Sequence, residues 1–196
     1  LLLAATPGPD MTLSISRALT QGPGPALFVV IGTSLGIVVH TLLVAFGISA
    51  LITASPTAFL ILKTGGAAYL LWLAVQAIRY GSNFTVKAAT GPRGTALANI
   101  STGFGVNLLN PKVIIFFMTF LPQFISASDP NVTGKLIFLG LFLIVVGIPV
   151  NIVAILAADK LSAWLQQNPK VLRGIDYTFA GVFSVFAMKI FFTQAK

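Results

Sequence analysis

Three ionisable side chains interrupt long apolar stretches of the sequence, and they are the first candidates for chemistry. They are Asp10, His40 and Lys112, in a chain of 196 residues of which only 8% are charged. An ionisable group in an apolar setting is costly to bury unless it is paired or hydrated, so each one needs a reason. Asp10 lies seven residues before Arg17, which is roughly 10 Å along a helix. We therefore expect Asp10 near the midplane of a membrane.

Asp10 and Lys112 each follow a proline that interrupts a helix-compatible stretch. Pro9 suits the first position of a helix, so Gly8-Pro9-Asp10 is expected to begin a new half-helix, and Pro111 gives Lys112 the same setting. Irregular backbone at membrane depth is tolerated only where it faces protein or a watery cavity. Two such breaks facing each other would form a polar chamber.

Three polar side chains accompany these breaks. Asn107 and Asn110 are three residues apart and share one face of the helix before the second break. Ser14 follows Asp10 by one turn, where it either faces the chamber or bonds back to its own helix. We include all three among the candidate substrate-binding residues.

Two interpretations of Asp10 and Lys112 stay open. In the first, they form a structural salt bridge that neutralises two buried charges and fixes the packing. In the second, they bind a zwitterionic solute, Asp10 taking its ammonium and the second break its carboxylate. The two can coexist if the solute displaces the bridge.

His40 is the obvious titrating group of the second apolar stretch. Gly32 and Gly36 precede it at helical spacing, and small residues at such spacing mark close helix packing, so His40 is expected to face inward. An inward histidine is either a hydrogen-bonded packing residue or a proton carrier. His40 and Asp10 are therefore the proton-coupling candidates.

Composition identifies lipid as the solvent of this chain. Hydrophobic residues make up 56% of it, and residues 26–51, 59–78, 136–158 and 175–192 are each close to or beyond the roughly 20 apolar residues that cross a bilayer. The net charge of +8 comes from lysines and arginines clustered in short connections, a membrane-topology pattern rather than a nucleic-acid surface. The absence of cysteine excludes a disulfide scaffold and a thiolate metal site.

The apolar stretches and their Pro and Gly punctuation predict an all-α integral membrane protein of about six transmembrane helices. The sequence starts without Met, so the first helix is expected to have lost its opening turns. The first helix is interrupted at residues 7–9 and the fourth, over 99–124, at 110–112. The second ends near 54, the third near 80, the fifth covers 134–158, and a polar connection over 159–173 precedes the sixth. The predicted units are a three-helix repeat (1–80), a cytoplasmic loop (81–96) and a second three-helix repeat (97–196).

The two halves are expected to be inverted repeats. Each begins with a Pro-broken helix, and the third helix of each carries basic residues at matching offsets. Because each half has an odd number of helices, the second must run upside down relative to the first. Basic residues gather in the first, third and fifth connections, which places those connections in the cytoplasm and both termini outside.

The motifs resemble those of the LysE/RhtB family of amino-acid exporters over nearly the whole chain. They read ATPGPD at 5–10, GGAAYL at 65–70 and GFGVNLLNPK at 103–112, with the glycine ladder before His40. The resemblance implies efflux of amino acids or their derivatives, of the neutral homoserine, threonine or leucine type, from a bacterial cytoplasm across the inner membrane, with proton antiport. The implied site residues are Pro7, Gly8, Pro9 and Asp10 in the first signature and Asn107, Asn110, Pro111 and Lys112 in the second.

Alternative functions are an exporter of another small ion or metabolite and a purely structural membrane protein. A membrane protease lacks its nucleophile or second aspartate, and one histidine with no cysteine makes a soft-metal site improbable. We expect no enzyme activity, no metal, no cofactor and no nucleic-acid partner. The expected partners are protons, a small solute, lipid and, compatible with the glycine spacing, a second copy of the chain.

Overall fold

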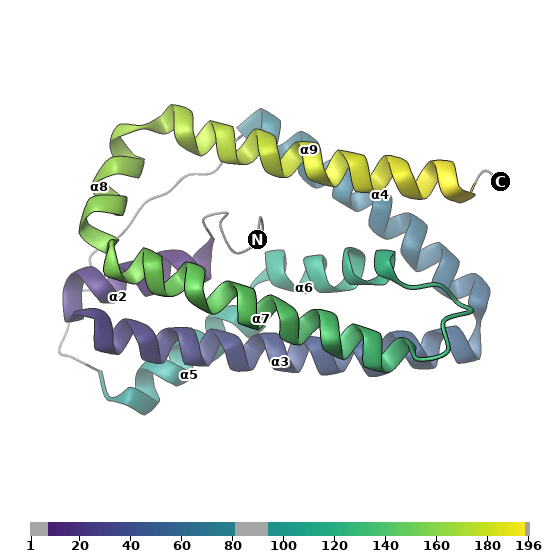
Figure 1. The fold of residues 1–196 in the computed structure, drawn as a ribbon, viewed down its shortest axis with the longest axis horizontal. Coiled ribbons are helices and arrows are strands. Elements are labelled where there is room, and N and C mark those ends of the chain that lie inside the picture. Colours follow the sequence, from purple (N-terminus) through teal and green to yellow (C-terminus); the bar gives the residue numbers. More distant parts are fainter. Residues whose placement is uncertain (1–7, 81–93, 195–196) are drawn as a thin grey trace.

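The computed structural model describes residues 8–80 and 94–194, and this part of the chain is helical with no strand. Most of its helices follow one long direction, and α8 runs across that direction at one end (Figure 1). The elements are α2 (Pro9–Gln21), α3 (Pro23–Ala54), α4 (Pro56–Tyr80), α5 (Ala96–Leu108), α6 (Pro111–Thr119), the 3-10 helix η1 (Leu121–Phe124), α7 (Val132–Leu156), α8 (Ala158–Gln167) and α9 (Pro169–Gln194).

Prolines and polar caps explain where these helices begin. A proline stands at the start of α2, α3, α4, α6 and α9, where its missing N–H costs nothing and its fixed φ favours the helix. The side chains of Thr95 and Asn131 cap α5 and α7 by accepting the N–H groups of Ala98 and Gly134. Gly22, with φ of +92°, makes the sharp turn between α2 and α3.

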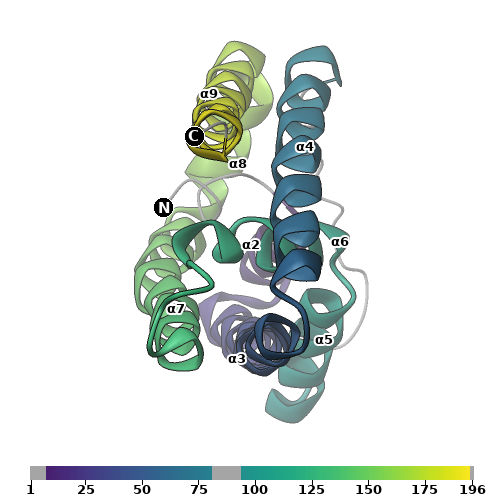
Figure 2. The same ribbon diagram turned by 90° about the vertical axis from the view of Figure 1, so that its right-hand side faces the viewer.

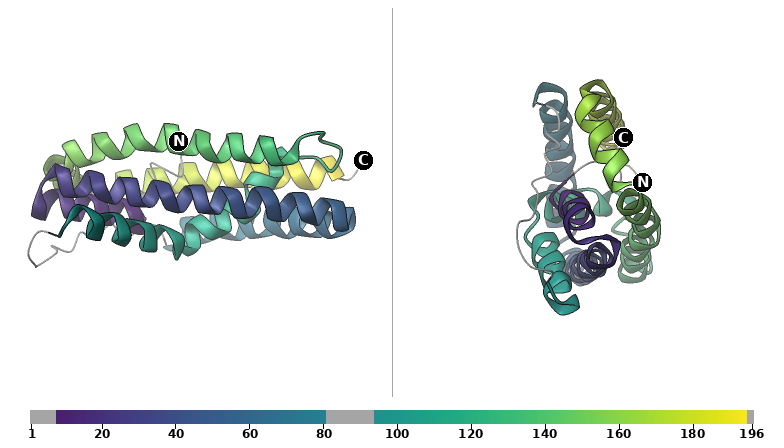
Figure 3. Two further views of the ribbon diagram at one scale, coloured as in Figure 1. Left: turned by 90° about the horizontal axis from the view of Figure 1, so that it is seen from below. Right: turned by 90° about the vertical axis from the view of Figure 1, so that its left-hand side faces the viewer.

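Helix α3 is the central element of the bundle. It packs along α5 on one side and along α7 on the other, as Figure 3 shows from below. Helices α4 and α9 pack on each other, and α4 also contacts α3 and α6 (Figure 2). The short α2 and α6 lie between these two groups. Both α2 and α6 contribute residues to the cavity described below.

Glycine brings the helix backbones into direct contact where α3 crosses its neighbours. A Cβ atom on Gly32 would strike the Ile100 carbonyl of α5, and one on Gly103 would strike the Val29 carbonyl of α3. Gly36 lies directly against the side chain of Asn107. The predicted role of Gly32 and Gly36 in close packing is confirmed, and it fixes α5 against α3 beside the break that begins α6.

Three described helices are long and apolar enough to cross a membrane: α3, most of α4, and α7. The pair α5 and α6, bent by 54°, passes the same test if it counts as one broken span. Large apolar side chains such as Ile61, Phe138 and Val145 are two-thirds exposed, which suits contact with lipid. The described helices therefore supply three or four candidate spans, and the expected six stay a prediction.

Three predicted boundaries are corrected by the structure. Residues 159–173 do not form an irregular connection, because α8 and the first turns of α9 cover them. Helix α8 is short and only half apolar, so a search for long apolar stretches overlooks it. The fourth helix begins at Ala96 rather than 99 because Thr95 caps it, and the fifth covers Val132–Leu156 because Asn131 caps it. The predicted loop 81–96 and the break at Pro7 lie largely outside the described residues.

Candidate functional site

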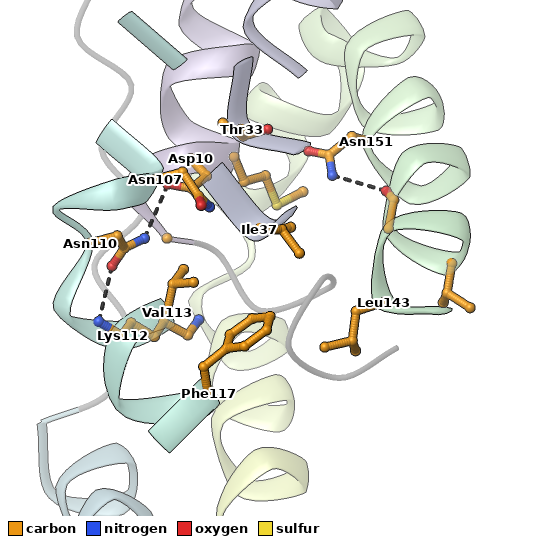
Figure 4. Close-up of a pocket in the computed structure, with 14 residues that line it drawn as sticks. Asp10, Thr33, Ile37, Asn107, Asn110, Lys112, Val113, Phe117, Leu143 and Asn151 are labelled. Carbon is orange, nitrogen blue, oxygen red and sulfur yellow. Dashed lines mark hydrogen bonds between the residues drawn. The ribbon is translucent and has the colours of Figure 1, made fainter. Parts of the chain in front are cut away.

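Asp10 lies in the first turn of α2, immediately after the extended residue Gly8 and the helix-starting Pro9. Its carboxylate accepts two hydrogen bonds from the other half of the chain. The Asn107 amide donates to Oδ2 at 2.6 Å, and the Asn110 amide donates to Oδ1 at 3.1 Å. Asp10 thus meets two side chains that are about a hundred positions away in the sequence, at the break between α5 and α6 (Figure 4).

Asn110 has two functions at this break. Its Oδ1 accepts the backbone N–H of Lys112 at 3.0 Å, which caps the start of α6, while its amide holds Asp10. Its own N–H donates to the Asn107 carbonyl at 3.1 Å, which closes the end of α5. The break is therefore a hydrogen-bonded turn that fixes Asn110 relative to Asp10.

A cavity of about 100 Å³ lies beside this turn, and Asp10 and Lys112 both line it. Ile37, Val113 and Phe117 form part of its apolar wall (Figure 4). We refer to it as the Asp10 cavity. It is lined by Gly8, Asp10, Met11, Thr33, Ile37, Asn107, Asn110, Lys112, Val113, Phe117, Leu143, Val146, Gly147 and Asn151. A carboxylate and an ammonium at one small cavity can hold a molecule that carries both charges.

The predicted salt bridge between Asp10 and Lys112 is not formed in the described part of the chain. The hydrogen-bond donors to the Asp10 carboxylate are the two asparagine amides. Lys112 is mostly buried in the first turn of α6 and interacts electrostatically with two carboxylates, those of Asp10 and Asp176. Asn107 Oδ1 is buried without a hydrogen-bond partner in the described residues and faces Gly36.

His40 lies behind the Asp10 cavity rather than in its wall. It is buried, its Nε2 is 3.4 Å from the Asn107 carbonyl oxygen, and its ring is 5.6 Å from that of Phe117. The expectation that His40 faces inward is confirmed. It connects to Asp10 through Asn107, and it also lines a separate, largely apolar cavity next to α6.

Of the other predicted site residues, some line the Asp10 cavity and others do not. Gly8 lines the Asp10 cavity, whereas Pro9 is exposed at the start of α2. Ser14 is buried and donates to the carbonyl of Asp10 at 3.0 Å, so the structure favours the back-bonded alternative. Pro111 begins α6, and Pro7 lies outside the described residues.

Sequence reasoning missed two polar contributors. Thr33 lines the Asp10 cavity and donates back to Val30 at 3.0 Å, and nothing marks it among other threonines of the stretch. Asp176 on α9 is only 2% exposed, so the expectation that the chain buries no second aspartate is wrong. Its signal was visible, because it is an acidic residue inside the apolar stretch 175–192.

The described residues contain no group of three histidine, aspartate or glutamate side chains that could hold a metal ion.

Comparison with known proteins gives a consistent set of relatives. The model of the LysE type translocator family matches residues 1–194. A homoserine/homoserine lactone efflux protein of Salmonella typhimurium is 33% identical over 184 residues, covering 93% of this chain and 87% of the relative. A cysteine/O-acetylserine efflux protein of Klebsiella pneumoniae is 31% identical over 64% of this chain and 61% of its own. A leucine efflux protein of Enterobacter is 29% identical over 66% and 61%. No solved structure matches.

Proposed function

The chain belongs to the LysE type translocator family, as its motifs predict, and we propose that it exports neutral amino acids or their derivatives from the bacterial cytoplasm across the inner membrane. The observation that carries the proposal is that Asp10 and Lys112 line one cavity at a helix break. Relatives named for efflux of homoserine, O-acetylserine and leucine support a substrate with an ammonium and a carboxylate.

In this proposal the substrate ammonium binds Asp10 and its carboxylate binds Lys112. The asparagine amides orient the Asp10 carboxylate without neutralising it, so its charge remains to attract a cation. The apolar wall of Ile37, Val113 and Phe117 then meets the substrate side chain. A neutral side chain suits that wall better than a charged one.

We further propose that the transporter has six spans in two inverted repeats, with both termini on the outer side. Helix α3 packs on α7 and α4 packs on α9, as expected if a two-fold axis in the membrane plane relates the second helix to the fifth and the third to the sixth. The proline-started α2 and α6 carry Asp10 and Lys112 at matching places. These pairings support the repeat.

Export is proposed to be coupled to proton entry through Asp10 and His40. The two groups interact electrostatically, and the Asn107 residue connects them by hydrogen bonds. A proton on Asp10 would remove the charge that holds the substrate ammonium, so proton binding and substrate binding would alternate.

The test is efflux from proteoliposomes of a panel of radiolabelled amino acids, with and without a pH gradient. We expect export of neutral amino acids by the native protein, loss of at least about tenfold in rate for Asp10→Asn and Lys112→Ala, and loss of gradient stimulation alone for His40→Gln. Size-exclusion profiles and thermal unfolding verify that each variant is folded. Well-folded native protein that exports no amino acid, with or without a gradient, would overturn the proposal in favour of another solute or a structural role.

A further inference from the structure

A second buried carboxylate lies outside the motifs of the proposed site. Asp176 belongs to α9 and is 2% exposed, although its neighbours Arg173 and Tyr177 are exposed. An ionised carboxylate at such a position is costly unless a cation compensates it. The identity of that cation decides what Asp176 does.

The inward face of α9 belongs to the same hydrophobic core as α6. Ala180 follows Asp176 by one helical turn and is 1% exposed in the hydrophobic core that contains Val113 and Phe117 of α6. Residues four positions apart on a helix share one face. Asp176 is therefore on the face of α9 that lies in this core, and Lys112 in the first turn of α6 is close enough to interact with it electrostatically.

Among the described residues, Lys112 and Arg173 are the candidates to compensate Asp176. Lys112 is mostly buried and interacts electrostatically with it. Arg173, one turn earlier on α9, is exposed and donates to the Ile78 carbonyl of α4 at 3.2 Å. Burial matches Asp176 with Lys112, because Arg173 is already bonded at the surface of the α4 and α9 pair.

We propose that Asp176 is the resting counterion of Lys112, a positioning residue that holds the ammonium until the substrate carboxylate replaces it. Asp10 then keeps its two amide donors, and each charge of the site has its own partner in the absence of substrate. The replacement is an exchange of one carboxylate for another at Lys112, so no charge is left bare at any stage.

The exchange would connect the cavity to the movement of α9. Helix α9 packs mainly along α4, and α4 in turn contacts α3 and α6 (Figure 2). An ion pair between Asp176 and Lys112 ties α9 to the helix break, and substrate binding releases that tie. The release step rests on the proposed function, whereas the ion pair itself does not.

The pairing is tested by a cycle of thermal unfolding in detergent with Asp176→Asn, Lys112→Met and the double variant. If the two charges compensate each other, each single variant should lower Tm by about 5 °C or more, and the double variant should lose less than the two losses added together. Arg173→Gln is the control for the other cation and should not relieve the loss of Asp176→Asn. Additive losses, or relief by Arg173→Gln, would overturn the pairing. If Asp176→Asn alone does not accumulate, recovery of folded protein in the double variant is the same readout.

Competition with substrate is tested by transport kinetics. Without Asp176 the substrate carboxylate has no rival for Lys112, so Asp176→Asn should lower KM about three- to tenfold and slow maximal efflux, while Asp176→Glu should keep the native KM. A fall in maximal rate with unchanged KM would contradict the exchange. Native protein that transports no amino acid would remove the proposed function and leave the unfolding cycle to decide the ion pair.

Discussion

Among the uncharged contacts of the site, the one between Gly36 and Asn107 should tolerate substitution least. A Cβ atom on Gly36 would lie 2.9 Å from both Cβ and Cγ of Asn107 and closer still to its Oδ1. Ordinary contact begins at 3.4 Å, so Asn107 must move by roughly 0.5 Å or more, against the close packing of helix interiors. Its amide holds Asp10 at 2.6 Å, and such a shift misaligns that bond.

The magnitude follows from three contributions. Overpacking costs about 1–3 kcal/mol, and a weakened hydrogen bond to a charged group costs up to about 1.5–3 kcal/mol. Alanine gains roughly 1 kcal/mol of helix propensity over glycine. We expect Gly36→Ala to lose about 2–4 kcal/mol of unfolding free energy, or roughly 5–10 °C in Tm, together with most of its efflux activity.

The matched control is Gly47→Ala on the same helix, where a Cβ atom would meet nothing within 4 Å. It should be as stable as the native protein or slightly more stable, and fully active. In an Asn107→Ala background, Gly36→Ala should lose less stability than in the native protein, because Oδ1 and Cγ are gone and only the contact with Cβ is left. The assay is thermal unfolding in detergent beside vesicle efflux. Native stability and efflux for Gly36→Ala would refute the argument that Gly36 positions Asn107 and, through it, Asp10.

Two further predictions use other parts of the chain. Asn110→Ala removes both a helix cap and a donor to Asp10 and should cost roughly 2–4 kcal/mol, whereas Asn131→Ala removes only the cap of α7 and should cost about 1 kcal/mol; equal losses by thermal unfolding would contradict the double role of Asn110. The Ser126 N–H and then Lys135 hold the pKa of Asp129 below its ordinary value of 3.8. Because this pKa is depressed in the folded protein, its contribution to stability is complete above pH 3.8 and lost as pH falls below it; Asp129→Asn should remove that part of the acid loss in a pH series of unfolding curves, and identical pH profiles would contradict it.

Local signals in the sequence predict the broken helices well and the long-range pairing only in part. Prolines and polar caps are local signals of helix boundaries. The second helix ends at Ala54 and the third at Tyr80, as expected. The convergence of Asp10 with Asn107 and Asn110 was expected from two matching breaks. The sequence does not show which side chains donate hydrogen bonds to Asp10. That depends on the glycine contacts that set the distance between α3 and α5.

The elements that were missed share a physical cause. A search for apolar length detects helices that lipid stabilises, but α8 is short and half polar, and α9 carries Asp176 on a face covered by other helices. Burial of a single acidic residue depends on tertiary packing, which spacing within one helix does not report. Thr33 lines the cavity through the same kind of packing. The charge partners of Lys112 therefore become visible only once α6 and α9 are placed together.

The separation of Asp10 from Lys112 makes physical sense for a site that has to bind and release a zwitterion. A direct bridge between them would satisfy both charges, and a substrate would have to break it before gaining anything. Neutral amide donors instead hold Asp10 while leaving its negative charge in place, and a second carboxylate compensates Lys112. On the proposed mechanism, the substrate then meets two preoriented groups of opposite charge. Each group exchanges one partner for another and is never left without a partner. Binding of moderate strength follows, and a transporter needs that more than tight binding because every bound molecule must also leave.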